Sequence, residues 1–330
     1  MALTSLLNEL ISANLKQQEC KQLIDWLPYW GEKQLQYQCD GPFVSAVAAA
    51  TAADRMAWAF FSGYQGAVQA TFKSQAAPGK VSAICVNEKG RKITEIETTL
   101  TRIGNESFIN GKKSWSLGNV ASLQLFVLAK NFDGPSKGPG SLIFVEIPNS
   151  APGLQEEVRH DQGPVPELPH SEVTFSHVQV QEARIVPGDG YAHYAKPFRL
   201  REDIFVTAAT LAYLLGEARK ASWPTSWAQK CIGVISGLHA CSSMNPDETG
   251  THILTAGALG LASQVIYESE FMWRHSDHEK LSRWHRDYAL LSMGREARRQ
   301  RSIKSWRSMG WTVPDHAGLG DHISGAMFVV

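Results

Sequence analysis

The sequence predicts an α+β protein in which a middle antiparallel β-sandwich or barrel lies between two helical segments. Short apolar runs rich in Val, Ile, Thr and Phe follow one another between residues 81 and 180, as in β-strands. Before and after them, apolar residues recur at three- and four-residue spacing, which is typical of amphipathic helices. No helical pattern separates the short runs, so an antiparallel sheet is favoured. We expect an N-terminal helical domain (1–78), the β domain (79–190) and a C-terminal helical bundle (191–330).

The composition is that of an ordinary globular protein. The 330 residues carry a formal net charge of zero and 43% are apolar, so bulk charge indicates neither nucleic acid nor a membrane surface as a partner. The five cysteines are scattered without a Cys-x-x-Cys pair, which favours reduced thiols and a cytoplasmic protein. The first ten residues lack the basic segment of a signal peptide, so none is expected.

The N-terminal helical pattern has two parts. Apolar residues between 3 and 28 predict a first helix, which Pro28 is expected to end. Residues 43–72 are rich in alanine and predict a packed helical pair interrupted at Asp54-Arg55. This second segment is too polar to span a bilayer. The stretch 76–80, with a Pro-Gly pair, marks the change from helical to strand periodicity.

The middle segment predicts five strands and the turns between them. The strands are expected at residues 81–86, 96–103, 123–129, 142–147 and 173–180. Asn105, after Gly104, and Asn110-Gly111 are predicted hairpin positions, because Gly and Asn tolerate positive φ at little steric cost.

The C-terminal segment predicts a helical bundle. A turn is expected at Gly188-Asp189-Gly190, and helices follow at residues 202–219, 227–242, 252–273 and 279–307. Pro and Gly residues in the tail 313–330 indicate a loosely structured end.

The motifs of several common enzyme classes are missing. No Gly-x-Gly-x-x-Gly follows a strand, and neither a P-loop nor a Gly-x-Ser-x-Gly motif is present, which argues against Rossmann, P-loop and α/β-hydrolase chemistry. His275 and His278 are metal-ligand types, but flanking arginines favour a solvated helix start and we expect no metal site. The basic residues between 295 and 307 suit either phosphate binding or, more simply, a solvated or subunit-facing surface.

Four stretches share a pattern with one known family. Residues 83–88 look like a strand that ends in Thr-Glu, and residues 104–115 are similar to Gly-x-x-(aromatic)-x-(Ile/Leu)-Asn-Gly-x-Lys-x-Trp. Residues 173–180 and 188–191 match Val-x-Phe-x-x-Val-x-Val followed by Gly-x-Gly-(aromatic), and Arg286-Asp287 matches an Arg-Asp pair on a late helix. On these residues the chain resembles the acyl-CoA dehydrogenase superfamily, flavoproteins with a helical, a β and a second helical domain.

The resemblance implies FAD as the cofactor and the α,β-dehydrogenation of an acyl thioester carried by CoA or an acyl carrier. In that reaction a carboxylate removes the α-proton while hydride leaves the β-carbon for the flavin. The resemblance implies Val86, Asn87, Trp115 and Ser116 along the flavin, and Glu296 as a candidate base. It also implies a homodimer or homotetramer, and it does not indicate the electron acceptor.

Two of these residue assignments have alternatives. Trp115 is otherwise a packed core tryptophan, and Glu296 is otherwise a solvated partner of Arg299 or Gln300. Two helix-borne carboxylates, Glu202 and Asp203, are alternative bases.

Two other functions stay open at this point. Tyr267 and Glu268 stand where the family has two glycines that approach a pyrophosphate, and Asn87 stands where it has Thr. A cofactor-free scaffold that acts as a binding partner would tolerate these changes. A flavin-dependent monooxygenase on the same fold would need no α-proton base.

Overall fold

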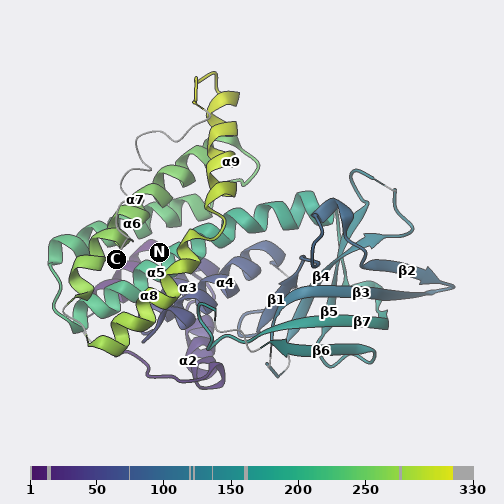
Figure 1. Cartoon of the computed structure of the whole chain (residues 1–330), viewed down its shortest axis with the longest axis horizontal. Helices are drawn as coiled ribbons and strands as arrows, with labels where there is room; N and C mark the ends of the chain where they lie inside the picture. Colours follow the sequence, from purple (N-terminus) through teal and green to yellow (C-terminus); the bar gives the residue numbers. More distant parts are fainter. Residues whose placement is uncertain are drawn as a thin grey trace.

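The computed structural model describes residues 2–12, 16–73, 75–118, 120–121, 123–135, 137–159, 163–274 and 277–314. Four helices come first, eight strands follow, and five further helices complete the described chain. The strands gather at one end of the molecule and the helices at the other, with α5 running between them (Figure 1). The predicted α+β class is therefore confirmed, whereas the domain boundaries at residues 78 and 190 stay a prediction.

The N-terminal helices are α1 (Ala2–Ile11), α2 (Leu23–Gln36), α3 (Pro42–Ala50) and α4 (Met56–Phe72). The predicted pair over residues 43–72 corresponds to α3 and α4. The prediction that Pro28 ends a helix is wrong, because α2 continues through it. Pro28 lacks the N–H that would bind the carbonyl of Ile24. Trp26 and Trp30 on either side are 0% and 1% exposed, so their packing outweighs that loss.

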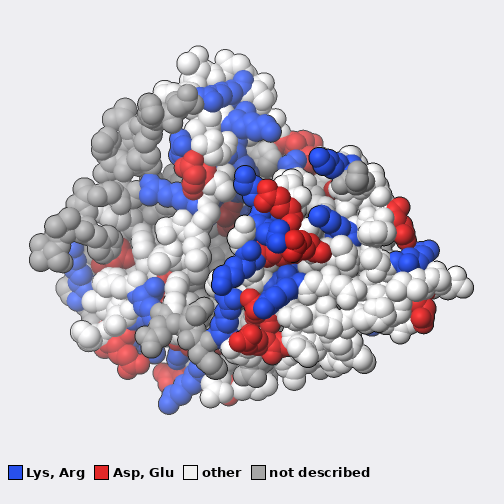
Figure 2. Space-filling view, turned by 45° about the vertical axis from the view of Figure 1, so that its right-hand side comes forward, with Lys and Arg blue, Asp and Glu red and all other residues white. Residues whose placement is uncertain are grey.

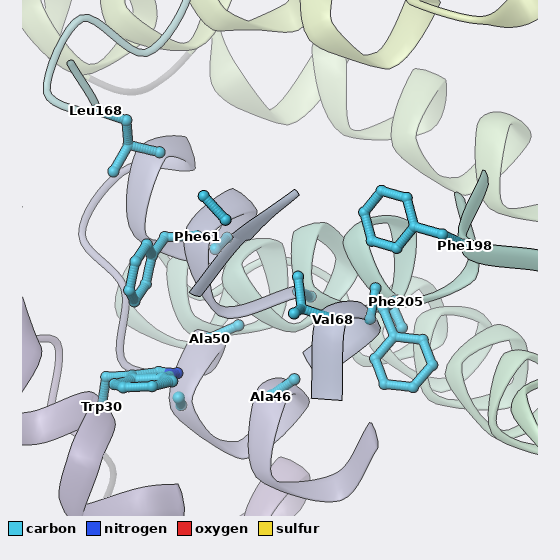
Figure 3. Close-up of a cluster of buried hydrophobic side chains, with 14 of the residues drawn as sticks. Trp30, Ala46, Ala50, Phe61, Val68, Leu168, Phe198 and Phe205 are labelled. Atoms are coloured by element: carbon cyan, nitrogen blue, oxygen red, sulfur yellow. The ribbon is translucent and has the colours of Figure 1, made fainter. Parts of the chain in front are cut away.

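Helices α3 and α4 form the centre of the helical core against α5 (Lys196–Lys220). A Cβ added at Gly63 would lie 2.7 Å from the Cα of Val206, so a glycine is required where α4 crosses α5. Figure 3 shows part of this core, with side chains from α2, α3, α4 and α5 in one cluster. The cluster continues to Leu168 and Phe198, which also line a cavity.

The sheet is formed by β1 (Ser82–Cys85), β2 (Thr99–Ile103), β3 (Glu106–Leu117), β4 (Gln124–Asn131), β5 (Leu142–Pro148), β6 (Leu154–Arg159), β7 (His170–Val180) and β8 (Ile185–Val186). Its order is β6-β7-β3-β2-β4-β5-β8, and β1 also pairs with β4. The pairings are antiparallel except for β1–β4 and β2–β4. All five predicted strands are present. The apolar pattern does not predict the other three strands. These are β3, which contains the Asn110-Gly111 pair assigned to a turn, β6, whose sequence LQEEVR is largely polar, and the two-residue β8.

One of the two predicted hairpin positions is wrong. The β2–β3 turn lies at Gly104-Asn105, as predicted, and Gly104 has a φ of 63°. Asn110-Gly111 instead lies inside β3, where Gly111 has a φ of 143° and marks a shift in the pairing with β7. A Cβ at Gly111 would lie 2.5 Å from Thr98, so a glycine is needed for the close approach of the backbone to Thr98.

The C-terminal helices follow a short π-helical segment, Gly190–Ala195. After α5 they are α6 (Thr225–Ser242), α7 (Thr249–Trp273), α8 (His278–Ser292) and α9 (Arg295–Ser308). The predicted single helix over residues 279–307 is wrong, because Gly294 adopts a left-handed φ of 72° and separates α8 from α9. The predicted loose tail lies outside the described residues from 315 onward. Within the described chain, no helix is both long and apolar enough to cross a membrane.

Candidate active site

A cavity of about 560 Å³ lies where the sheet meets α4 and α5. Its lining combines aromatic rings, aliphatic side chains, one carboxylate and three cations. The residues come from seven parts of the chain: Phe60, Phe61, Tyr64, Ile84, Val86, Asn87, Ile93, Trp115, Ser116, Leu117, Leu168, His170, Tyr191, Ala195, Lys196, Phe198, Arg199, Glu202 and Arg301. Such a mixture of an apolar wall with a few charged groups is typical of a ligand site.

Trp115 forms one wall of the cavity. Its side chain is 43% exposed, although it belongs to a central strand of the sheet. The His170 ring contacts it edge-on, with centroids 5.1 Å apart and an interplanar angle of 78°. The Arg159 guanidinium lies 5.8 Å from the Trp115 ring centroid. The ring is therefore held by neighbours on β6 and β7 while part of its surface faces the cavity.

A buried ion pair holds the strand segment that carries Trp115. Lys113 Nζ lies 2.8 Å from Glu88 Oε1 and 3.2 Å from the carbonyl of Val86, and the Ser114 N–H donates to Asn87 O at 2.9 Å. These contacts bind β3 to the chain that leaves β1. The pairing of β3 with β7 shifts between Lys113 and Ser116, which lets the intervening backbone bind β1 instead.

Glu88 is also held from a second direction. Its carboxylate accepts the N–H of Glu97 at 2.6 Å, the N–H of Thr98 at 3.0 Å and the Thr98 hydroxyl at 2.6 Å. Burial by itself would raise the pKa of Glu88, but the bonds from Lys113, Thr98 and Glu97 outweigh it and hold the pKa below its usual range. Glu88 is therefore an ionised anchor of the cavity wall.

The carboxylate of the cavity belongs to Glu202 on α5. Its side chain is 23% exposed and accepts a bond from Arg199 Nη1 at 3.3 Å. Burial raises the pKa of Glu202 above its usual value, and the Arg199 charge opposes that shift only in part. The three-residue spacing puts Arg199 and Glu202 on one face of α5, so both side chains line the cavity. A carboxyl group with a raised pKa is suited to take and return a proton near neutral pH.

Three cations also line the cavity. Lys196 and Arg199 come from the start of α5, and Arg301 comes from α9. Arg298 Nη1 lies 3.0 Å from Asp203 Oδ1, and Arg301 pairs with the same carboxylate, so this acid holds α9 against α5. On the face shown in Figure 2, Lys and Arg side chains are interspersed with Asp and Glu side chains and form no large surface of one sign.

Aromatic side chains of α4 and α5 form the apolar wall. Phe60 and Tyr64 stack with centroids 6.2 Å apart, and the Phe198 ring meets Tyr64 edge-on at 5.8 Å. The Tyr64 hydroxyl accepts the N–H of Ile84 at 2.8 Å and so links α4 to β1. Burial raises the pKa of Tyr64, so this hydroxyl stays neutral. The apolar wall is thus fixed to the sheet by a hydrogen bond.

The segment before β7 is fixed by acidic side chains. Asp287 Oδ1 accepts the N–H of Val165 at 2.8 Å, and Val165 has an unusual φ of 48°. Arg286 Nη2 lies 3.0 Å from both carboxylate oxygens of Glu167, and Arg55 Nη1 binds the same group at 3.3 Å. The Arg-Asp pair noted in the sequence therefore anchors the segment from which Leu168 reaches the cavity.

The four predicted cofactor residues all line this cavity. Val86, Asn87, Trp115 and Ser116 come from the end of β1 and from β3. Glu296 does not line it. That carboxylate lies on α9 with 68% of its side chain exposed, and Arg299 and Gln300 bind it. These bonds lower the pKa of Glu296 to about 2. Of the two alternative carboxylates, Glu202 lines the cavity, whereas Asp203 does not and is paired with Arg298 and Arg301.

Several lining residues are not predicted from the sequence. Tyr64, His170 and Phe198 belong to apolar or strand patterns that indicate packing alone. For Glu202, an acidic residue three positions after an arginine on an amphipathic helix is a weak signal. Among the described residues, no group of three or more His, Cys, Asp and Glu side chains is placed to hold a metal, and His275 lies outside them.

The cavity residues fit the flat ring of a flavin. The open part of Trp115 and the apolar side chains offer contact area, and Ser116 lines the same wall. The phosphates of FAD have no matching glycine pair in this chain. Tyr267 and Glu268 on α7 stand where the family has two glycines, and neither residue lines the cavity. The Glu268 carboxylate is instead paired with Lys230, at 3.0 Å from its Nζ.

Comparisons with known proteins identify the fold. No protein-family model and no curated protein matches the chain. Among solved structures, butyryl-CoA dehydrogenase from Megasphaera elsdenii matches with a TM-score of 0.67 at 14% identity, over 93% of this chain and 97% of that one. The prolyl acyl carrier protein oxidase AnaB matches with a TM-score of 0.63 at 14% identity, over 94% and 97%. Glutaryl-CoA dehydrogenase from Mycobacterium smegmatis matches with a TM-score of 0.59 at 12% identity, over 96% and 95%.

These matches span almost the whole of each chain. The protein therefore has the fold of the acyl-CoA dehydrogenases, and the resemblance in the sequence is confirmed at the level of the fold.

Proposed function

We propose that the protein is a flavin-dependent oxidoreductase that removes two hydrogens from an acyl thioester. The observation that carries this proposal is that Trp115 and Glu202 line one cavity: an open aromatic face from the sheet and a carboxyl group with a raised pKa from α5. A similar structure, glutaryl-CoA dehydrogenase from Mycobacterium smegmatis in complex with FADH2, supports FAD as the cofactor.

The residues of the cavity would have different roles in this reaction. A bound flavin supplies the acceptor for the hydride that leaves the β-carbon. Glu202 in its ionised form takes the proton from the α-carbon, so the substrate loses one proton and one hydride and gains a C=C bond. Phe60, Tyr64 and Phe198 exclude water from the acyl group, and Trp115 with Ser116 would contact the ring. Arg199 holds the Glu202 carboxylate in position.

The thioester carrier and the assembly are part of the proposal. Similar structures include butyryl-CoA and glutaryl-CoA dehydrogenases and a prolyl acyl carrier protein oxidase, which supports CoA or an acyl carrier protein as the carrier of the acyl group. A structure of an electron transferring flavoprotein from Acidaminococcus fermentans also matches, at a TM-score of 0.60 and 14% identity. We propose a homodimer or homotetramer in the cytoplasm, where the five free thiols would stay reduced.

The test begins with the absorbance spectrum of the purified protein. A bound flavin gives a visible spectrum, and anaerobic addition of acyl-CoA thioesters of increasing chain length should bleach it. Bleaching that needs a separate reductase, with consumption of oxygen, would indicate a monooxygenase instead. A protein that stays colourless after incubation with FAD, and that binds none by calorimetry, would contradict the proposal and favour a cofactor-free scaffold.

A further inference from the structure

Helix α9 carries a local excess of positive charge. Its sequence, REARRQRSIKSWRS, contains six basic residues and one acid, a net charge of +5, whereas the whole chain has a net charge of zero. Arg298 and Arg301 both bind Asp203 of α5, and Arg301 also lines the cavity, so these two mark the inner side of the helix. The other four cations of α9 do not line the cavity.

These four cations lie along the outer half of the helix, which we call the outer face of α9. Arg295, Lys304 and Arg307 are exposed, and Arg299, one turn after Arg295, pairs with Glu296, the one acid of the helix. The outer face extends from residue 295 to residue 307, about 18 Å at the rise of an α-helix. The phosphates of one nucleotide meet only part of such a line, whereas an acidic protein surface can meet all of it.

Large apolar side chains flank these cations at both ends of the helix. Met293, before α9, is 62% exposed, and Met309 and Trp311, after it, are 61% and 64% exposed. The Trp311 ring contacts the Trp306 ring edge-on, with centroids 5.0 Å apart and an interplanar angle of 65°. Arg, Trp and Met are residues that protein interfaces favour. The combination of cations with exposed apolar side chains is therefore suited to docking an acidic protein.

The position of α9 indicates what such a partner would bring. In Figure 1 the helix rises past α7 and ends beyond the other helices of that view. Its inner side supplies Arg301 to the cavity, so a protein on its outer face lies about one helix diameter, or 10 Å, from the cavity. We propose that the outer face of α9 docks an acidic acyl carrier protein, which presents the acyl thioester on its phosphopantetheine arm. This inference rests on the proposed function, and of the two carriers named there it selects the carrier protein.

The test measures the binding of a small acidic acyl carrier protein that bears a butyryl thioester and a fluorescent label, by fluorescence anisotropy. The affinity should fall at least about fivefold between about 50 and 300 mM salt, because salt screens charges on the surface. The triple variant Arg295→Glu/Lys304→Glu/Arg307→Glu should bind the carrier protein at least about thirtyfold more weakly, because like charges then face each other. Trp311→Ala should weaken binding about tenfold without any change of charge.

The matched control makes the same change of charge on other elements. Lys21→Glu/Lys130→Glu/Lys220→Glu reverses three exposed lysines, which lie before α2, on β4 and at the end of α5. This control should bind the carrier protein within about twofold of the wild type. Equal losses in the two triple variants would show that net charge rather than α9 attracts the carrier protein, and would overturn the proposal. Wild-type binding to vesicles of anionic lipid, with none to the carrier protein, would also overturn it.

Butyryl-pantetheine, a neutral thioester without a carrier protein, separates docking from chemistry. It should reduce bound flavin at the same rate in the wild type and in the α9 triple variant, because the substituted residues do not line the cavity. Binding of the carrier protein without any reduction of flavin would support docking and contradict the proposed oxidoreductase. Reduction of flavin by butyryl-CoA, without any binding of the carrier protein, would overturn docking and leave the proposed oxidoreductase in place.

Discussion

Lys113 Nζ lies 2.8 Å from Glu88 Oε1, and the two side chains are 0% and 6% exposed. This buried pair joins the strand that carries Trp115 to the chain that leaves β1, beside Val86 and Asn87. Glu88 has three further donors from Glu97 and Thr98, so its carboxylate is fully used. A buried pair of this kind contributes little to stability relative to an apolar pair, but it fixes a geometry. Here it fixes the wall of the cavity.

Replacement of Lys113 by Met should destabilise the protein by about 3–5 kcal/mol, because Glu88 is left buried without its counterion. Urea denaturation at neutral pH measures this loss. Lys112→Met is the matched control: Lys112 is the adjacent residue and pairs with Glu172, but 57% of its side chain is exposed. Its loss should cost less than about 1 kcal/mol. Equal effects of the two substitutions would contradict the assignment of an anchoring role to the buried pair.

The same pair predicts a dependence of stability on pH. The pKa of Glu88 is depressed in the folded state, so the stability it contributes is present above its unfolded value and is lost as the pH falls through the folded value. The difference in unfolding free energy between the wild type and Lys113→Met should therefore shrink as the pH is lowered. A difference that stays constant in acid would show that the Glu88 charge is not its source.

Glu202→Gln should lower the rate of anaerobic flavin reduction by an acyl thioester roughly 100- to 10,000-fold, because the α-proton loses its acceptor. Stopped-flow absorbance measures that rate. Glu296→Gln is the control, since that carboxylate is exposed and bound by Arg299. It should leave the rate within about twofold, as expected for a surface group. The opposite ranking of the two variants would restore Glu296 as the base.

The raised pKa of Glu202 adds a pH test for the same residue. The base must be ionised, so the rate of reduction should rise with pH through a pKa above the usual range for Glu. Burial opposes that ionisation, so folding stability contributed by protonated Glu202 is lost as the pH rises through the folded pKa. Relative to the wild type, the Glu202→Gln protein should therefore become more stable as the pH rises through that pKa. If the unfolding free energies of the two proteins changed in parallel with pH, the pKa of Glu202 would not be raised by folding.

Local chemistry accounts for much of what the sequence predicts correctly. Short apolar runs predict five of the eight described strands, and Gly104-Asn105 predicts the first hairpin, because these signals depend on neighbours in the chain. The cofactor residues have a different source, because the resemblance to a known family implies Val86, Asn87, Trp115 and Ser116, and pairing in the sheet places them along one cavity. All four predicted cofactor residues are brought together in this way, although their contact with a flavin stays a prediction.

The predictions that fail depend on packing between distant segments. Pro28 remains inside α2 because buried tryptophans hold that helix, and no property of Pro28 itself indicates this. The choice of Glu202 rather than Glu296 as the candidate base depends on which of the two side chains lines the cavity in the folded protein. Both residues lie near arginines in the sequence, and only the fold distinguishes a residue of the cavity from a surface residue. His170 and Phe198 are absent from the predicted site for the same reason.

Gly294→Ala should destabilise the protein by about 1–2 kcal/mol, because a side chain disfavours the left-handed φ of 72° between α8 and α9. Thermal unfolding measures the effect. Gly257→Ala is the matched control: Gly257 lies within α7, where an added Cβ meets nothing within 4 Å, so it should be neutral or stabilising by up to about 1 kcal/mol. Similar losses at both sites would show that conformation at Gly294 is not the cause.

Trp115→Ala tests whether the open ring face contacts the flavin. The residue is 43% exposed, so truncation should cost the fold less than Trp284→Ala, which removes a side chain that is 1% exposed and should cost about 3–5 kcal/mol. Flavin affinity, measured by fluorescence titration, should fall roughly ten- to a hundredfold, because the aromatic contact is lost. Trp115→Phe keeps a ring and should retain most of the affinity. Unchanged flavin affinity in Trp115→Ala, with a loss of stability like that of Trp284→Ala, would show that Trp115 serves packing alone.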